Sequence, residues 1–88
     1  MKHTIELIGN TPLYKIEDTN IYVKLEKFNV GGSVKDRAVL GMLQDAIKKG
    51  VLTSESVLIE ATSGNTGIAL AMLGAVYKIP VVIIMPEL

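Results

Sequence analysis

Two neighbouring segments near the end of this 88-residue chain are apolar on every side. Residues 68–76 are long enough for a helix and carry no polar side chain, and residues 79–85 form a continuous apolar run of strand length. A helix that is hydrophobic all round is normally buried on all sides. Strands without polar alternation are typical of parallel sheets covered on both faces. The two segments therefore predict the interior of a layered α/β domain.

The segments around this pair predict a βαβ unit. Residues 56–60 form a β-type run, and a helix over residues 65–77 would connect it to a strand over residues 80–85. A second helix is predicted from residue 35 to about residue 49, because apolar residues recur there at helical spacing until Gly50 ends the run. The fold class is α/β.

Shorter elements are predicted upstream of the first helix. Residues 5–7 and 13–16 are expected to be extended pieces on either side of a turn over residues 9–12. Residues 21–26 alternate between apolar and polar side chains like a strand. The parallel unit is thus preceded by short strands.

Lys35 occupies an unusual place at the start of the first predicted helix. Ser33 and Asp36 match a Ser-x-x-Asp capping box, which predicts where that helix begins. The N-terminal end of a helix is its positive end and disfavours an ammonium group by up to ~1 kcal/mol. An amine there is easier to deprotonate, and the neutral amine is the form that attacks aldehydes. Lys35 is therefore a candidate Schiff-base lysine, and the alternative is an exposed lysine that extends its charge into water.

A polar turn between the strand and the helix of the βαβ unit is the second candidate site. It comprises Thr62, Ser63, Gly64, Asn65 and Thr66. In a parallel α/β sheet such a turn lies at the carboxyl end of its strand, where ligands bind. The free N–H groups at the start of the following helix suit a carboxylate or phosphate. The turn lacks the motifs of a Walker A loop and of a dinucleotide site, so it is either an anion site or a simple helix cap.

Composition excludes several other classes of function. The formal net charge is +0, with no basic patch for nucleic acid. The absence of cysteine excludes a disulfide scaffold or a thiol nucleophile and fits a cytoplasmic protein. A single histidine, His3, predicts no metal site. No apolar run approaches the ~20 residues of a membrane span.

Four ordered motifs resemble those of one enzyme family. They are Gly-Asn-Thr-Pro-Leu at residues 9–13, Lys-Leu-Glu at 24–26, Gly-Ser-Val-Lys-Asp-Arg at 32–37 and Thr-Ser-Gly-Asn-Thr-Gly at 62–67. Together they resemble the cysteine synthase (O-acetylserine sulfhydrylase) and cystathionine β-synthase family of pyridoxal-phosphate enzymes. The resemblance covers the whole chain and implies the fold-type II architecture, which is similar to that of the tryptophan synthase β-subunit. Val30 departs from it, because the family usually has proline there.

The resemblance implies a role for each candidate residue. Lys35 matches the lysine that holds pyridoxal 5′-phosphate as a Schiff base and later moves the α-proton. Asn65 matches the residue that hydrogen-bonds the ring hydroxyl of the cofactor. The loop that binds the substrate carboxylate in this family corresponds here to Thr62, Ser63, the backbone of Gly64, and Thr66. The motif at residues 9–13 resembles a structural signature, to which we assign no catalytic part.

The activity implied by the resemblance is β-replacement on an amino acid. We expect a cysteine synthase that forms L-cysteine from O-acetyl-L-serine and sulfide. A cystathionine β-synthase, a cysteine desulfhydrase or a lanthionine-forming enzyme remains the alternative, with serine or cysteine as the amino-acid substrate. The complete enzyme is expected to be a homodimer, without a nucleic-acid or membrane partner.

The length of the chain predicts that it is the N-terminal piece of a larger enzyme. Enzymes of the family that this chain resembles have a glycine- and threonine-rich loop that binds the cofactor phosphate and a polar residue that contacts the pyridine nitrogen. No motif of this chain matches either. Residues 1–34 are expected to pack with a second domain encoded downstream, and residues 35–88 to begin the smaller α/β domain. An inert fragment that acts only as an assembly piece is the alternative from another class.

Overall fold

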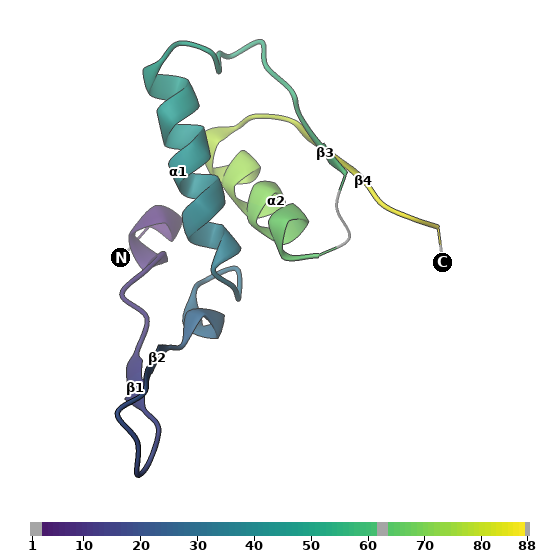
Figure 1. Cartoon of the computed structure of the whole chain (residues 1–88). Helices are drawn as coiled ribbons and strands as arrows, with labels where there is room; N and C mark the ends of the chain where they lie inside the picture. Colours follow the sequence, from purple (N-terminus) through teal and green to yellow (C-terminus); the bar gives the residue numbers. More distant parts are fainter. Residues whose placement is uncertain (1–2, 62–63, 88) are drawn as a thin grey trace.

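The computed structural model describes residues 3–61 and 64–87 and shows a mixed α/β arrangement (Figure 1). The elements follow one another along the chain as two 3-10 helices (η), two α-helices and four strands. Their order is η1 (Thr4–Leu7), β1 (Leu13–Lys15), β2 (Tyr22–Lys24), η2 (Glu26–Phe28), α1 (Lys35–Lys48), β3 (Leu58–Ala61), α2 (Asn65–Tyr77) and β4 (Val81–Ile84).

The predicted βαβ unit is confirmed. β3 and β4 pair in parallel, with a register that runs from Leu58 opposite Val81 to Ala61 opposite Ile84, and α2 connects them. Both strands are within two residues of their predicted bounds, and α2 begins and ends where predicted. Although α2 is apolar, it has only 13 residues, and neither it nor another helix in the described ranges is long and apolar enough to cross a membrane.

The core lies where α1 packs against α2. Val39 and Leu43 are four residues apart on α1 and are buried together with Ala69, Leu70 and Leu73 of α2. Residues at this spacing share one face of a helix. The apolar stripe that predicted α1 is therefore the surface that meets α2, and α2 in turn packs against β3 and β4.

One face of the β3–β4 sheet is open. Side chains alternate along both strands, and Ile59 and Ile84 are 64% and 56% exposed. The described residues therefore cover only one face of these apolar strands. The reason is that α2 and α1 lie in succession on one side of the sheet and leave the opposite face uncovered (Figure 1).

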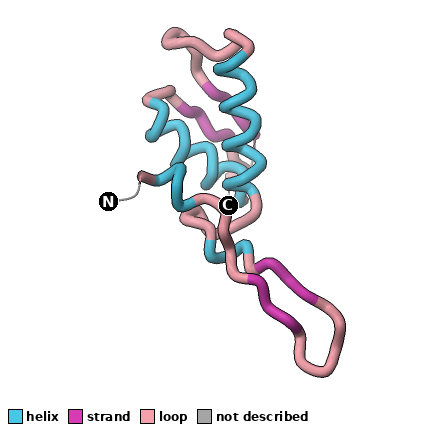
Figure 2. The backbone as a smooth tube through the Cα atoms, turned by 90° about the vertical axis from the view of Figure 1, so that its left-hand side faces the viewer, coloured by secondary structure: helices cyan, strands magenta, loops and turns pink. Residues whose placement is uncertain are grey.

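The β1–β2 hairpin forms a projecting arm. β1 and β2 pair antiparallel, with Leu13 opposite Lys24, and Figure 2 shows this hairpin projecting away from the helices. The prediction of an extended piece at residues 5–7 is wrong, because η1 occupies this segment. The apolar side chains Ile5 and Ile8 of this turn pack against the core, so tertiary packing favours a turn over a strand.

Gly74 sets how closely α2 approaches β4. A Cβ atom at Gly74 would lie 2.2 Å from Cγ2 of Val81 and 3.1 Å from the carbonyl oxygen of Ile79. Overpacking of this kind usually costs ~1–3 kcal/mol. We therefore expect Gly74→Ala to lower the free energy of unfolding of the full-length protein by at least about 1 kcal/mol, measured by denaturant titration.

The matched control is Gly41→Ala on α1. A Cβ atom at Gly41 would meet nothing within 4 Å, and replacing an interior helical glycine by alanine gains ~0.5–1 kcal/mol. The same substitution should thus have opposite signs in the two helices. An unchanged or raised stability for Gly74→Ala would show that α2 and β4 are not in close contact.

Candidate functional site

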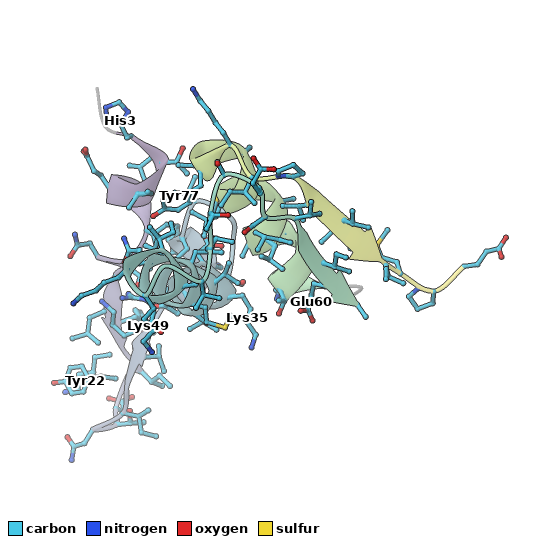
Figure 3. The ribbon with its side chains drawn as sticks, turned by 90° about the horizontal axis from the view of Figure 1, so that it is seen from above. His3, Tyr22, Lys35, Lys49, Glu60 and Tyr77 are labelled. Atoms are coloured by element: carbon cyan, nitrogen blue, oxygen red, sulfur yellow. The ribbon has the colours of Figure 1, made fainter. Side chains whose placement is uncertain are left out.

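Lys35 is the first residue of α1, as predicted. Its side chain is exposed, and within the described part of the chain its Nζ atom has no hydrogen bond or ion pair. Figure 3 shows Lys35 extending from α1 on the side that carries Glu60, not on the side of Tyr22. The amine is therefore free to react with a ligand on that side of the helix.

The predicted capping box at the start of α1 is wrong. The N-cap residue is Val34, without a side-chain capping bond. Oγ of Ser33 accepts the N–H of Lys35 at 3.1 Å, whereas Oδ2 of Asp36 accepts the N–H of Gly31 at 2.6 Å and not that of Ser33.

The reason for this rearrangement is the close approach of Gly31 to Asp36. A Cβ atom at Gly31 would lie only 2.3 Å from Oδ1 of Asp36, so only glycine leaves room for the carboxylate. Asp36 is fully buried there. Its side chain consequently holds the loop that leads into Lys35, a role that helix-capping rules alone do not predict.

The polar turn before α2 is described in part. Thr62 and Ser63 lie outside the described residues, and Gly64 is the N-cap of α2. Asn65 is the first residue of the helix and is exposed, and Thr66 is half-buried. The first N–H groups of a helix have no partner within it. The N–H of Gly67 donates to the carbonyl oxygen of Gly64 at 3.1 Å, so the donors offered at this end are the backbone N–H groups and side chains of Asn65 and Thr66.

The structure places the starts of the two helices on the same side. α1 packs against α2, and Figure 1 shows both helices beginning at the same end of the packed pair. Lys35 and Asn65 are the first residues of these helices. The two predicted segments, about 30 positions apart in the sequence, thus contribute to one region of the molecule.

A cavity near this region is lined by one residue of the predicted site, Thr66. It has a volume of about 250 Å³ and lies between α1, β3 and α2, with Glu60 and Thr66 among its few polar residues. Neither Lys35 nor Asn65 lines it. Its mostly apolar lining belongs to the junction of helices and sheet, and it is unsuited to a charged cofactor.

Four side chains that the sequence analysis did not single out form a polar cluster beside the start of α1. They are Thr11, Glu26, Asn29 and Arg37. The Nε and Nη2 atoms of Arg37 donate to the two carboxylate oxygens of Glu26 at 2.7 and 3.2 Å, and Nη2 also donates to Oγ1 of Thr11 at 3.2 Å. The hydroxyl of Thr11 donates to Glu26 at 2.5 Å.

Asn29 connects this polar cluster to the turn at Gly9. Its Nδ2 atom donates to Oε2 of Glu26 at 2.7 Å, and its Oδ1 atom accepts the N–H of Gly9 at 2.7 Å. Thr11 and Asn29 are each only 4% exposed. Thr11, Glu26 and Arg37 lie in the family motifs and Asn29 lies between two of these motifs, which is the signal in the sequence that could have found them.

Hydrogen bonds in the polar cluster keep Glu26 ionised. The Arg37 guanidinium, followed by the Thr11 hydroxyl, lowers the pKa of Glu26 from 4.5 to about 2, and the Glu26 carboxylate raises the pKa of Arg37. Hydrogen bonds that favour a carboxylate over its protonated form have this effect. Both members of the pair are charged at neutral pH.

The lowered pKa of Glu26 predicts a specific loss of stability in acid. Between about pH 4.5 and pH 2 the unfolded state binds a proton at Glu26 that the folded state does not bind. The contribution of Glu26 is therefore fully present above pH 4.5 and is lost as the pH falls through about 2. Denaturant titrations of the full-length protein should show a flatter decline over this range for Glu26→Gln than for the wild type. Parallel curves would contradict the assigned pKa.

Comparison with known proteins places this geometry in a family. The model of a protein family described as "Pyridoxal-phosphate dependent enzyme" matches residues 5–88. A cysteine synthase of Aquifex aeolicus is 52% identical over 93% of this chain and 28% of its own length, and a cystathionine β-synthase of Apis mellifera is 46% identical over 99% and 19%. The solved structure of an O-acetylserine sulfhydrylase (isoform 3) from Entamoeba histolytica superposes with a TM-score of 0.90 and 44% identity, covering 99% of this chain and 29% of that one.

The chain thus spans less than a third of the length of these relatives. The match nevertheless includes every described element, with the Lys35 turn, the start of α2 and the polar cluster among them. The parallel βαβ unit agrees with it. The chain belongs to the family of pyridoxal-phosphate dependent enzymes.

Proposed function

We propose that this chain supplies the Schiff-base lysine and the substrate-carboxylate loop of a cysteine synthase. The observation that carries the proposal is the position of Lys35, which is exposed and unpaired within the described residues at the start of α1, at the end of the helix pair where α2 also begins. The identity of 52% to a cysteine synthase supports the choice of reaction.

The donors on this side of the molecule fit pyridoxal phosphate. An unpaired lysine amine is the group that condenses with the cofactor aldehyde, and the exposed amide of Asn65 is suited to the ring hydroxyl. The cofactor, when bound, stabilises the carbanion at the amino-acid Cα. The group that binds its phosphate would come from residues outside this chain.

The residues of this chain hold the substrate and move its proton. The N–H groups at the start of α2, with the side chains of Thr62, Ser63 and Thr66 and the backbone of Gly64, bind the α-carboxylate. Binding at this end fixes the amino acid so that its Cα–H lies near the Lys35 amine, which is an orientation effect. Lys35 Nζ then accepts the α-proton as a general base.

The remaining expectations concern the complete enzyme. In this proposal residues 1–34 pack with a second domain, and residues 35–88 begin the smaller one. The projecting hairpin and its exposed apolar residues Leu13, Ile21 and Tyr22 support such packing. We further propose a cytoplasmic homodimer that uses O-acetylserine and a sulfur nucleophile.

Cystathionine formation is the second candidate function. It is favoured by the identity of 46% to a cystathionine β-synthase over 99% of the chain. The full-length protein should be assayed with O-acetylserine and sulfide, with serine and homocysteine, and with cysteine alone. The proposal predicts the highest kcat/KM for cysteine formation. A higher kcat/KM for cystathionine formation, or for sulfide release from cysteine, would show that this other reaction is the function of the protein.

The proposed carboxylate loop makes a prediction for Thr62→Ala. Removal of one hydrogen bond to a charged group costs ~1.5–3 kcal/mol, so amino-acid binding should weaken roughly tenfold to 100-fold. The absorbance of the cofactor bound to Lys35 should stay unchanged, because in this proposal the lost donor binds the substrate and not the cofactor. Titration of the full-length protein with an amino acid, followed by absorbance, measures both quantities.

Thr53→Ala is the matched control, because this exposed threonine lies beyond the C-terminal end of α1. It should bind amino acids like the wild type. If Thr62→Ala did so as well, the polar turn would serve only as the cap of α2.

A further inference from the structure

We propose that the polar cluster of Thr11, Glu26, Asn29 and Arg37 sets the direction of Lys35, so that Arg37 is a positioning residue for the reaction. This inference rests on the proposed function of Lys35. It assigns a task to the N-terminal segment, which otherwise contributes no reacting group.

Lys35 and Arg37 are two residues apart on α1. Residues two apart on an α-helix point in directions about 200° apart around its axis. Arg37 is held against Glu26 and Thr11 by three hydrogen bonds. Fixing Arg37 toward the N-terminal segment therefore turns Lys35 away from that segment, as Figure 3 shows.

The chain immediately before Lys35 is fixed by the same group of contacts. Nδ2 of Asn29 donates to the carbonyl oxygen of Ser33 at 3.0 Å, in addition to its bond to Glu26. The N–H of Gly31 is held by Asp36 at 2.6 Å. The backbone is thus restrained on both sides of Lys35.

The side chain of Lys35 has no restraint of its own. Among the described residues no partner holds its Nζ atom. The backbone at the start of α1 therefore sets where the stem of Lys35 begins, and with it the region that the amine can reach. A small rotation of this first turn would displace the amine at the end of a long, flexible stem.

Arg37 is suited to this task by its fork of donors. Its guanidinium engages both oxygens of Glu26 together, which fixes an angle as well as a distance. A lysine ammonium is a point charge and lacks this geometry. Arg37→Lys therefore keeps the charge while removing the angular restraint.

The experiment compares Arg37→Lys with Asp45→Asn in the full-length, cofactor-loaded protein. Asp45→Asn breaks the exposed Asp45–Lys49 ion pair of 2.9 Å near the other end of α1, so it perturbs a charged pair of the same helix far from Lys35. The measurements are kcat, KM, far-UV circular dichroism, and the rate at which an added amino acid displaces Lys35 from the cofactor, followed by stopped-flow absorbance.

Arg37→Lys should lower kcat and the displacement rate about 10- to 100-fold, because misplacement of a reacting group by ~1 Å has an effect of this size. KM and the circular dichroism spectrum should stay within about twofold of the wild type. Asp45→Asn should change none of these quantities. Wild-type kcat and displacement rate in folded Arg37→Lys would overturn the proposal and leave the polar cluster a purely structural role.

A second pair of variants covers the case in which Arg37→Lys does not fold. Thr11→Val keeps the shape of the side chain but removes the hydroxyl that contacts both Glu26 and Arg37. Thr11→Ser keeps the hydroxyl. Thr11→Val should slow the displacement rate several-fold, and Thr11→Ser should restore most of it. Equal rates in the two variants would overturn the proposal.

Failure of this inference differs from failure of the proposed function. If the wild type forms no covalent adduct at Lys35, the proposed function is wrong. If the wild type forms the adduct and is active, but Arg37→Lys and Thr11→Val react as fast as Asp45→Asn, only the positioning role is wrong.

Discussion

Replacement of Lys35 by alanine in the full-length protein is expected to lower kcat for cysteine formation by about 1,000-fold or more. The variant loses both the amine that holds the cofactor and the base that takes the α-proton, and a general base alone is worth ~100- to 10,000-fold. Steady-state assays with O-acetylserine and sulfide measure the loss. Circular dichroism should be unchanged, because the Lys35 side chain is exposed and has no partner among the described residues.

The matched control for this experiment is Lys48→Ala. Lys48 is exposed in the last turn of the same helix and has no part in the proposed chemistry. Its removal should leave kcat within about twofold of the wild type. Substantial activity in Lys35→Ala, or an equal loss in Lys48→Ala, would contradict the assignment of Lys35.

The second large effect is expected when residues 1–88 are expressed alone. The open face of the β3–β4 sheet exposes Ile59, Val82 and Ile84, and the hairpin exposes Leu13 and Tyr22. Contiguous apolar surface of this kind drives association. We expect light scattering to show oligomers or aggregates, and denaturant titration to show no cooperative monomer transition.

A double variant, Ile59→Thr with Ile84→Thr, tests whether the sheet face causes this association. Both residues are exposed on β3 and β4, so the change removes apolar surface without opening the core. The variant should associate less than the wild-type segment. A monodisperse wild-type monomer with a cooperative transition and a stable cofactor adduct would show that the segment is self-sufficient.

The parts of the fold that depend on local pattern could be predicted from the sequence. The helical spacing of Val39 and Leu43 indicated α1, and the apolar run over residues 68–76 indicated α2. These signals are strong because the period of the pattern matches the period of the element. η1 was missed because its turn is favoured by the packing of Ile5 and Ile8 on the core, which no local pattern records.

In the candidate site, too, the features with a local sequence signal could be predicted and those that depend on long-range contacts could not. Lys35 could be placed at the start of a helix from sequence alone, because its neighbours carry local signals. The polar cluster could not, since its hydrogen bonds join residues as far apart as Thr11 and Arg37. The prediction of a capping box was wrong because Gly31 leaves space for the Asp36 side chain to turn toward the loop. The hydrogen bond between Asp36 and Gly31 depends on the tertiary path of the chain.

The most direct test of the account is covalent mapping of the cofactor. The full-length protein should be incubated with pyridoxal phosphate, reduced with borohydride and digested, and the pyridoxyl-labelled peptide sequenced by mass spectrometry. The account predicts a single label on Lys35. A label on Lys24 or Lys27, or no label on any lysine of this segment, would contradict it.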